Sequence, residues 1–248
     1  LFVAGRGGVG KTWNVEDTLS QLGLSDGDGY FLNTGSVSAA GLYRLLFRHK
    51  NGLVVFDDAD DVFKDQTTRN YLKNATDTKK VRKLVFTKAG ANVVEEDDYE
   101  SPEELLDDDK VPRSFEFKGQ IIFISNLSKD KMDPDGALRT RGYMIDIDPT
   151  DDEVYDLMEK IVGAFDLGEG MSLSMEDRKY VVTILREGKT ISCGNFRKLD
   201  RALKMAAGEK KDGGDIRAQK YVNLAPRYSY SSDLSRITTR HIAVSPIA

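Results

Sequence analysis

The residues Gly5-Arg6-Gly7-Gly8-Val9-Gly10-Lys11-Thr12 form the most specific pattern in this sequence. They match the spacing G-x-x-x-x-G-K-[ST], follow a short apolar run and precede a helical pattern, which is the setting of a phosphate-binding loop. A glycine turn of purely structural use would not need Lys11 and Thr12. We therefore predict that Lys11 reaches the β- and γ-phosphates of a nucleotide and that Thr12 supplies a hydroxyl to Mg²⁺. The predicted nucleotide-binding residues are Gly5, Gly7, Gly8, Val9, Gly10, Lys11 and Thr12.

A second pattern places carboxylates at the end of an apolar strand. Leu53-Val54-Val55-Phe56 is followed directly by Asp57 and Asp58, and α/β sheets bind ligands at the carboxyl ends of their strands. We predict that Asp57 helps to hold Mg²⁺ and that Asp58 orients or deprotonates an attacking water. For Asp60 and Asp61, a helix cap or a solvated loop is the expected role.

Composition and charge narrow the class of protein. The chain has 248 residues and a formal net charge of −5, so it has no global attraction to nucleic acid, although a local basic surface stays open. Its single cysteine, Cys193, cannot form an intrachain disulfide, and the sequence shows no leader or long apolar run. We expect an inert thiol, no membrane association and a cytoplasmic location, in the host cytoplasm if the protein is viral. Because Leu1 already lies in a predicted strand, we also expect that the true N-terminus is missing.

Short apolar runs alternate with amphipathic stretches through residues 1–149. This alternation predicts an α/β domain, a three-layer P-loop NTPase parallel sheet flanked by helices. The predicted strands are Leu1–Ala4, Gly29–Asn33, Leu53–Phe56, Gln120–Ser125 and Tyr143–Ile147, and the predicted helices are Lys11–Leu22, Ala39–His49 and Asp65–Asn74.

The strand pattern ends at Pro149. Thr150 is expected to cap an apolar-periodic helix over Glu153–Phe165, and two further helices are predicted over Ser174–Glu187 and Asn195–Ala207. We predict a small all-α lid domain over residues 150–208. Residues 209–248 lack strong periodicity and are expected to form a C-terminal extension.

An acidic segment interrupts the sheet domain. Glu95–Asp109 carries ten acidic residues in fifteen and separates two alternating runs, Lys83–Lys88 and Ser114–Lys118. These runs predict a β-hairpin insertion over about residues 83–118 with an acidic loop. A solvated insertion without strand pairing is the alternative.

The order of these parts resembles the AAA+ family of ATPases over about residues 1–208. The strand Gln120–Ser125 ends at Asn126, which is similar to the sensor-1 position of that family. Asp133-Pro134-Asp135-Gly136-Ala137-Leu138-Arg139-Thr140-Arg141 resembles the segment that carries the arginine finger, with Arg141 as the first choice and Arg139 as the second. Gly194-Asn195-Phe196-Arg197-Lys198-Leu199 looks like the start of the sensor-2 helix, with Arg197 directed at the γ-phosphate.

The resemblance implies ATP as the nucleotide, Mg²⁺ as the metal and ATP hydrolysis as the reaction. It also implies a homo-oligomer, ring-shaped or helical and expected to be a hexamer, in which Arg141 acts on the nucleotide of a neighbouring subunit. Family members more often carry Glu where Asp58 stands, which bears on the rate of hydrolysis more than on nucleotide binding. The run Phe115–Asn126 is similar to phage-type members. The implied catalytic residues are Asp58, Asn126, Arg141 and Arg197, and the implied metal ligands are Thr12 and Asp57.

Several substrates fit the sequence. Basic residues flank the acidic loop and favour DNA, whereas the acidic tip opposes it. Asn33–Gly41 has no aromatic residue of the kind that protein-threading pore loops carry. The basic and tyrosine-bearing C-terminal region fits either a nucleic-acid arm or a tail docked on a neighbouring subunit. We expect an oligomeric motor or loader linked to DNA transactions, with a protein-remodelling chaperone or a slowly turning nucleotide-gated scaffold as alternatives. The flanking basic residues are Lys79, Lys80, Arg82, Lys83, Lys88, Lys110, Arg113 and Lys118.

Overall fold

The computed structural model describes residues 1–86, 93–95, 99, 105, 110–188 and 195–216. The chain divides into two compact units, Leu1–Val154 and Tyr155–Ala248, and each unit is described by itself. The expected inert thiol Cys193 and the basic, tyrosine-bearing C-terminal region lie outside the described residues.

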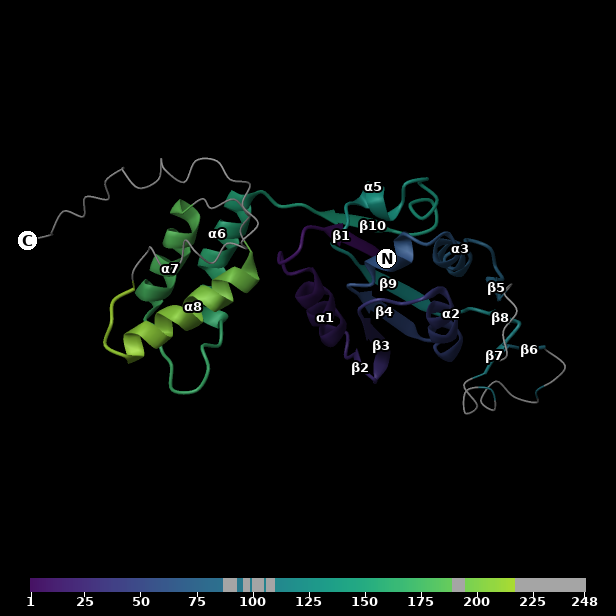
Figure 1. The fold of residues 1–248 in the computed structure, drawn as a ribbon, viewed down its shortest axis with the longest axis horizontal. Coiled ribbons are helices and arrows are strands. Elements are labelled where there is room, and N and C mark those ends of the chain that lie inside the picture. The colour runs from purple at the N-terminus through teal and green to yellow at the C-terminus, as the bar shows by residue number, and fades with distance from the viewer. Residues whose placement is uncertain (87–92, 96–98, 100–104, 106–109, 189–194, 217–248) are drawn as a thin grey trace, which may run out of the picture. The chain divides into compact units, whose positions relative to one another are not determined.

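A six-stranded parallel sheet forms the centre of the first unit (Figure 1). Most neighbouring strands are joined through a long connection, as parallel strands require, but β2 and β3 are separated by two residues only. This sheet and the helices around it confirm the predicted α/β fold class. In spatial order the strands are β10 (Met144–Ile147), β1 (Phe2–Gly5), β9 (Gln120–Ile124), β4 (Leu53–Asp57), β3 (Gly29–Thr34) and β2 (Ser25–Asp26).

Both faces of the sheet are covered, which explains why its central strands are apolar throughout. In β4, Val54 and Phe56 belong to the larger core, while Val55 belongs to the smaller one on the opposite face. The larger core includes side chains of α2 (Ala39–Arg48) and α3 (Gln66–Ala75), and the smaller one includes Leu19 of α1 (Lys11–Gln21). In Figure 1, α1 accordingly lies on the other side of the sheet from α2 and α3.

Three phenylalanines align the central strands. Phe123 of β9 stacks on Phe2 of β1, with 5.8 Å between ring centroids, and on Phe56 of β4, with 4.5 Å. All three rings are almost completely buried. Such aromatic pairs contribute about 0.5–1.5 kcal/mol each beyond their buried area. The ladder fixes the register of the three strands, and with it the positions at which their carboxyl ends lie.

Side-chain caps set the helix starts. Ser38 accepts a hydrogen bond from the backbone N–H of Gly41 at the start of α2, and Asp65 accepts one from Thr68 at the start of α3. Thr150 and Glu153 form a capping box at the start of α6 (Asp151–Ile161): Glu153 N–H donates to the Thr150 hydroxyl, and Thr150 N–H donates to the Glu153 carboxylate. The predicted cap at Thr150 is therefore confirmed.

Several boundaries differ from the predictions. The helix predicted over Glu153–Phe165 is split into α6 and a 3-10 turn, η3 (Val162–Ala164), and α8 (Phe196–Lys211) continues past Ala207. The prediction also missed short elements, because segments of two to four residues carry too little periodicity to detect. Besides η3 and β2, these are η1 (Asp60–Phe63), β6 (Val93–Val94), β7 (Val111–Pro112) and α5 (Lys129–Met132).

The runs on either side of the acidic segment pair with each other. β5 (Lys83–Val85) and β8 (Ser114–Glu116) are antiparallel, with Leu84 opposite Phe115, whereas β6 and β7 form a separate two-residue parallel pair. Arg113 pairs with Glu95 at 2.9 Å. Most of the acidic segment lies outside the described residues.

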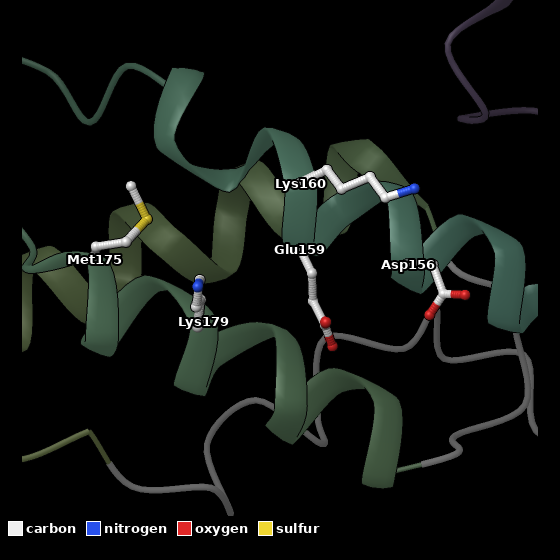
Figure 2. A pocket seen from close by; sticks show the side chains of 5 residues that line it. All are labelled: Asp156, Glu159, Lys160, Met175 and Lys179. Carbon is white, nitrogen blue, oxygen red and sulfur yellow. The ribbon is translucent and has the colours of Figure 1, made fainter.

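The second unit contains most of α6, together with η3, α7 (Met175–Glu187) and α8. An open depression of about 600 Å³ lies between α6 and α7. Asp156 and Glu159, which line it, project from α6 (Figure 2). Arg186 of α7 pairs with both carboxylates. The lining of the depression also includes Lys160, Met175 and Lys179, so it combines side chains of both charges with an apolar one. None of the helices among the described residues is long and apolar enough to cross a membrane.

Candidate functional site

Three neighbouring strands end at the same edge of the sheet. The glycine-rich loop follows β1, Asp57 and Asp58 stand at the end of β4, and Asn126 follows β9, which lies between the other two strands. Parallel pairing therefore brings together segments that are more than 40 and more than 100 residues apart in the chain. This is the edge at which open α/β sheets bind ligands.

The loop between β1 and α1 depends on glycine at defined positions. Gly8 and Gly10 have φ values of 80° and 88°, a region that other residues rarely adopt. Gly5 has φ 140°, and a Cβ atom placed there would lie 2.0 Å from the carbonyl oxygen of Ile147 in β10. Only glycine fits at Gly5, because the neighbouring strand lies directly against it.

Lys11 is nearly buried, with 6% of its surface exposed, and its ammonium group is fully coordinated. Nζ donates to the carbonyl oxygens of Gly5 and Arg6, each at 2.8 Å, and to Oδ1 of Asn126 at 2.9 Å. A buried cation requires such partners. Since an ammonium has three N–H donors, a phosphate oxygen would bind Lys11 by sharing or replacing one of these acceptors.

Thr12 and Asp57 form the candidate metal pair. The Thr12 hydroxyl donates to Oδ2 of Asp57 at 2.9 Å. Burial, the largest cause, raises the pKa of the Asp57 carboxyl above its ordinary value, and the negative charge of Asp58 acts in the same direction. A hydroxyl and a carboxylate are oxygen donors of the kind that Mg²⁺ prefers beside phosphate oxygens and water. The residues present therefore fit a magnesium ion that the nucleotide helps to hold.

Asn126 connects the loop to the second carboxylate. Its Oδ1 accepts from Lys11, and its Nδ2 donates to Oδ1 of Asp58 at 2.7 Å. Asp58 has φ 55° and is the single non-glycine residue with a positive φ in the described part of the chain. Asp and Asn tolerate this left-handed conformation better than most residues. A continuous hydrogen-bonded path thus runs from the lysine through the amide to a carboxylate that is open to solvent.

The two arginine candidates have different surroundings. Arg139 pairs with Asp130 and with Asp133, whose buried carboxylate also accepts the backbone N–H groups of Leu138 and Arg139. Arg141 donates from Nη1 to the carbonyl of Ala137 at 2.8 Å, while its Nε is buried without a hydrogen-bond partner in the described residues. Arg139 is thus paired with two carboxylates, whereas the guanidinium of Arg141 has one hydrogen bond among the described residues, to the carbonyl of Ala137.

Arg197 lies in α8 of the second unit. Its backbone N–H is the donor to the Asn195 side chain that caps α8. The role predicted for Arg197 at a γ-phosphate stays a prediction.

Sequence reasoning missed three features of the site. Trp13 of α1 is 66% exposed, which the sequence pattern does not indicate. Arg6, a variable position of the loop pattern, pairs with Asp151 at 2.7 Å. Asp60 accepts a hydrogen bond from the buried hydroxyl of Ser125, next to Asn126. No spacing rule points to these contacts; for Ser125, the only signal was a polar residue in an apolar strand.

Comparison with known proteins gives relatives but no family description. No family model matches the chain. An uncharacterized 36.7 kDa protein of Enterobacteria phage T4, from the nrdC-mobD intergenic region, is 29% identical over 188 residues. The match covers 71% of this chain and 54% of the phage protein, so the chain spans about half the length of the curated relative.

Solved structures with related folds include the FIGL-1 AAA domain in complex with ADP, with 13% identity, a TM-score of 0.44 and coverage of 94% of this chain and 73% of that chain. They also include a closed state of Hsp104 with ATPγS and FITC casein (10% identity, TM-score 0.48, coverage 89% and 37%). A third is PCH-2 of C. elegans (14% identity, TM-score 0.35, coverage 90% and 58%). With all TM-scores below 0.5, the fold assignment rests on the chain's own strand order and loop positions. These give a parallel α/β sheet with a glycine-rich loop after its first strand, and a helical second unit.

Replacing Asp57 by Asn should raise the melting temperature of the nucleotide-free protein at neutral pH. Because burial raises the pKa of Asp57, folding costs free energy while this carboxyl is ionised in both states, and the cost disappears as pH falls through the raised pKa toward 3.8. The gain should shrink over the same window in thermal unfolding measured from about pH 7 to about pH 3.5.

Asp61→Asn is the matched control with the opposite sign. Lys64 lowers the pKa of the exposed Asp61 carboxyl, so its ionised form stabilises the fold above the ordinary pKa and loses that effect in acid. This variant should melt slightly lower at neutral pH. A lower melting temperature for Asp57→Asn at pH 7 would contradict the assigned burial cost.

Proposed function

We propose that this chain is a Mg²⁺-dependent ATPase of the AAA+ class that works as an oligomeric motor or loader linked to DNA transactions. The observation that carries the proposal is the hydrogen-bonded path from Lys11 through Asn126 to Asp58, beside the Thr12–Asp57 pair. These residues lie at one edge of the sheet and provide a cation that can bind phosphate, a pair of oxygen ligands for a metal ion, and a carboxylate that is open to solvent. These are the parts that phosphoryl transfer to water needs.

Each residue has a distinct task in this proposal. The loop N–H groups and Lys11 bind the phosphates, and Thr12 and Asp57 orient the magnesium ion that neutralises charge on them. Asp58 orients the attacking water and accepts its proton. Asn126 donates to the carboxylate and lies beside Lys11, where it can sense whether a γ-phosphate is present.

The active site is completed by a neighbouring subunit in the proposed oligomer, for which we favour a hexamer. Arg141 is the candidate finger because it has fewer partners in its own chain than Arg139. A guanidinium at the transferring phosphoryl group stabilises charge that develops there. Arg197 would act on the same nucleotide from the second unit of its own chain.

The proposed link to DNA is supported by a basic surface at the β5–β8 pair. Lys79, Lys80, Lys83 and Lys118 are exposed there, although Lys79 and Lys118 pair loosely with Asp77 and Glu116, at 3.7 and 3.5 Å. Several cations on one surface favour binding of the phosphate backbone of a nucleic acid. A protein-remodelling chaperone and a slow nucleotide-gated scaffold are the competing functions. The phage relative supports action in a host cytoplasm.

Lys11→Ala should weaken ATP binding by at least about 100-fold, because charge-assisted hydrogen bonds contribute about 1.5–3 kcal/mol each. Trp13 is the only tryptophan of the chain and follows Thr12, so its fluorescence can report nucleotide at the loop. Lys64→Ala removes a lysine from the exposed surface and is the control. An affinity of Lys11→Ala within about threefold of the wild type would exclude this loop as the phosphate site.

Arg141→Ala should reduce ATP turnover by about 1,000-fold, the effect of losing an arginine finger. Mixing it with Lys11→Ala should restore activity, because some interfaces then combine an intact loop with an intact arginine. In a random equal mixture that fraction is about a quarter of all interfaces. Arg139→Ala is the control and should keep most of the activity. A mixture no more active than its components would count against a finger supplied by the neighbour.

Nucleic acid should stimulate ATP turnover, and the stimulation should weaken as salt rises, since phosphate contacts release counterions. The test compares rates with single-stranded DNA, duplex DNA and an unfolded polypeptide. Replacing Lys79 and Lys80 by Glu should reduce the stimulation while leaving the basal rate unchanged. Stimulation by polypeptide alone would replace the DNA-linked function with protein remodelling.

A further inference from the structure

The hydroxyl of Ser125 is a buried junction next to Asn126. It donates to Oδ1 of Asp60 at 2.5 Å and accepts the backbone N–H of Leu127 at 3.0 Å. Ser125 is 1% exposed, and its own backbone N–H donates to Val3 of β1. The Ser125 hydroxyl therefore fixes the backbone on both sides of Asn126, at Ser125 and at Leu127. Because the hydroxyl is buried, water cannot replace these hydrogen bonds.

These bonds lie beyond the end of the pairing between β4 and β9. The last residue pair between β4 and β9 is Asp57 with Ile124, so Asp58 and Asn126 both lie beyond the paired residues. Two side-chain contacts then link the strand ends: Asn126 to Asp58, and Ser125 to Asp60. The first involves candidate catalytic groups, and the second lies behind them in the more buried part of the structure.

We propose that Asp60 and Ser125 are positioning residues that hold Asn126 in the orientation at which its amide meets Lys11 and Asp58 at the same time. This inference rests on the proposed ATPase function and deepens it. The bond from a hydroxyl to a carboxylate is of the short, charge-assisted kind, which is stronger and more directional than a neutral one. Asn126 needs this support because both ends of its amide are used, so a small rotation loses a partner at one end.

The neighbouring acid shows that the role belongs to Asp60 rather than to acidity in general. Asp61 points to the exposed surface, where it accepts from Ser36 and pairs with Lys64. It has the same charge and lies in the same 3-10 turn η1, but its side chain binds Ser36 and Lys64. Substitutions of Asp60 and Asp61 can therefore be compared directly, because the two residues have the same chemistry and differ in position.

The first experiment separates binding from turnover. Asp60→Ala and Ser125→Ala should lower kcat for ATP by about 10- to 100-fold, as expected when a catalytic group is misplaced by a fraction of an ångström to an ångström. Nucleotide affinity, read from Trp13, should stay within about threefold of the wild type. Ser125→Thr keeps the hydroxyl and should restore most of kcat, and Asp61→Ala should leave it within about twofold.

A second experiment tests whether the pair acts through Asn126. In an Asn126→Ala background, adding Ser125→Ala should change kcat by less than about twofold, because the group that it positions is already gone. Additive losses would overturn the proposal. So would losses of nucleotide affinity as large as the losses of kcat, since a merely structural role lowers both.

A third measurement does not depend on turnover. The side-chain amide NMR signal of Asn126, assigned by its absence in Asn126→Ala, should shift in Asp60→Ala and Ser125→Ala and stay in place in Asp61→Ala. An unmoved signal in the first two variants would overturn the positioning role. A wild-type protein without ATP turnover would instead refute the proposed function, while this signal would still decide the positioning role.

Discussion

The side-chain amide of Asn126 is the contact on which the candidate site depends. Its oxygen binds an ammonium group and its nitrogen binds a carboxylate, so the two halves of one small group join opposite charges. Direct pairing of lysine with an aspartate would satisfy both charges and leave neither for a ligand. An amide between them keeps the charges near each other, and both remain usable.

That arrangement exists because three parallel strands end together. The aromatic ladder of Phe2, Phe123 and Phe56 sets the register deep in the core. Asp57, Asp58 and Asn126 follow the phenylalanine of their own strand within three residues, and Lys11 follows β1 after the glycine-rich loop. Hydrophobic packing thus positions the strand ends. Burying Lys11 and partly burying Asp57 at this edge is unfavourable for the free energy of folding. The buried middle of each strand therefore stabilises the fold, and the carboxyl end of the same strand carries the binding groups.

The sequence predicted the sheet because each central strand is apolar and each glycine-rich or acidic turn follows one. The loop motif predicted the phosphate-binding role of Lys11 and Thr12, the end of an apolar strand predicted the role of Asp57 and Asp58, and the resemblance to the AAA+ family implied the role of Asn126. The sequence could not predict partners that depend on side-chain direction. Asp60 and Asp61 are indistinguishable in the sequence, yet one points to Ser125 and the other to Lys64. The exposure of Trp13 was missed for the same reason, because helical spacing in the first turn does not reveal which face is covered.

The left-handed backbone at Asp58 also limits how this site can change over mutational time. A position with φ 55° favours Gly, Asn and Asp, so the glutamate that members of the AAA+ family, which the sequence resembles, more often carry there would have to strain the turn or reshape the end of β4. A single codon change to Glu is therefore a poor step, even though it keeps the charge. A longer carboxylate at this position would first require a change in the backbone conformation of the turn. The present turn accommodates the short side chain of Asp58.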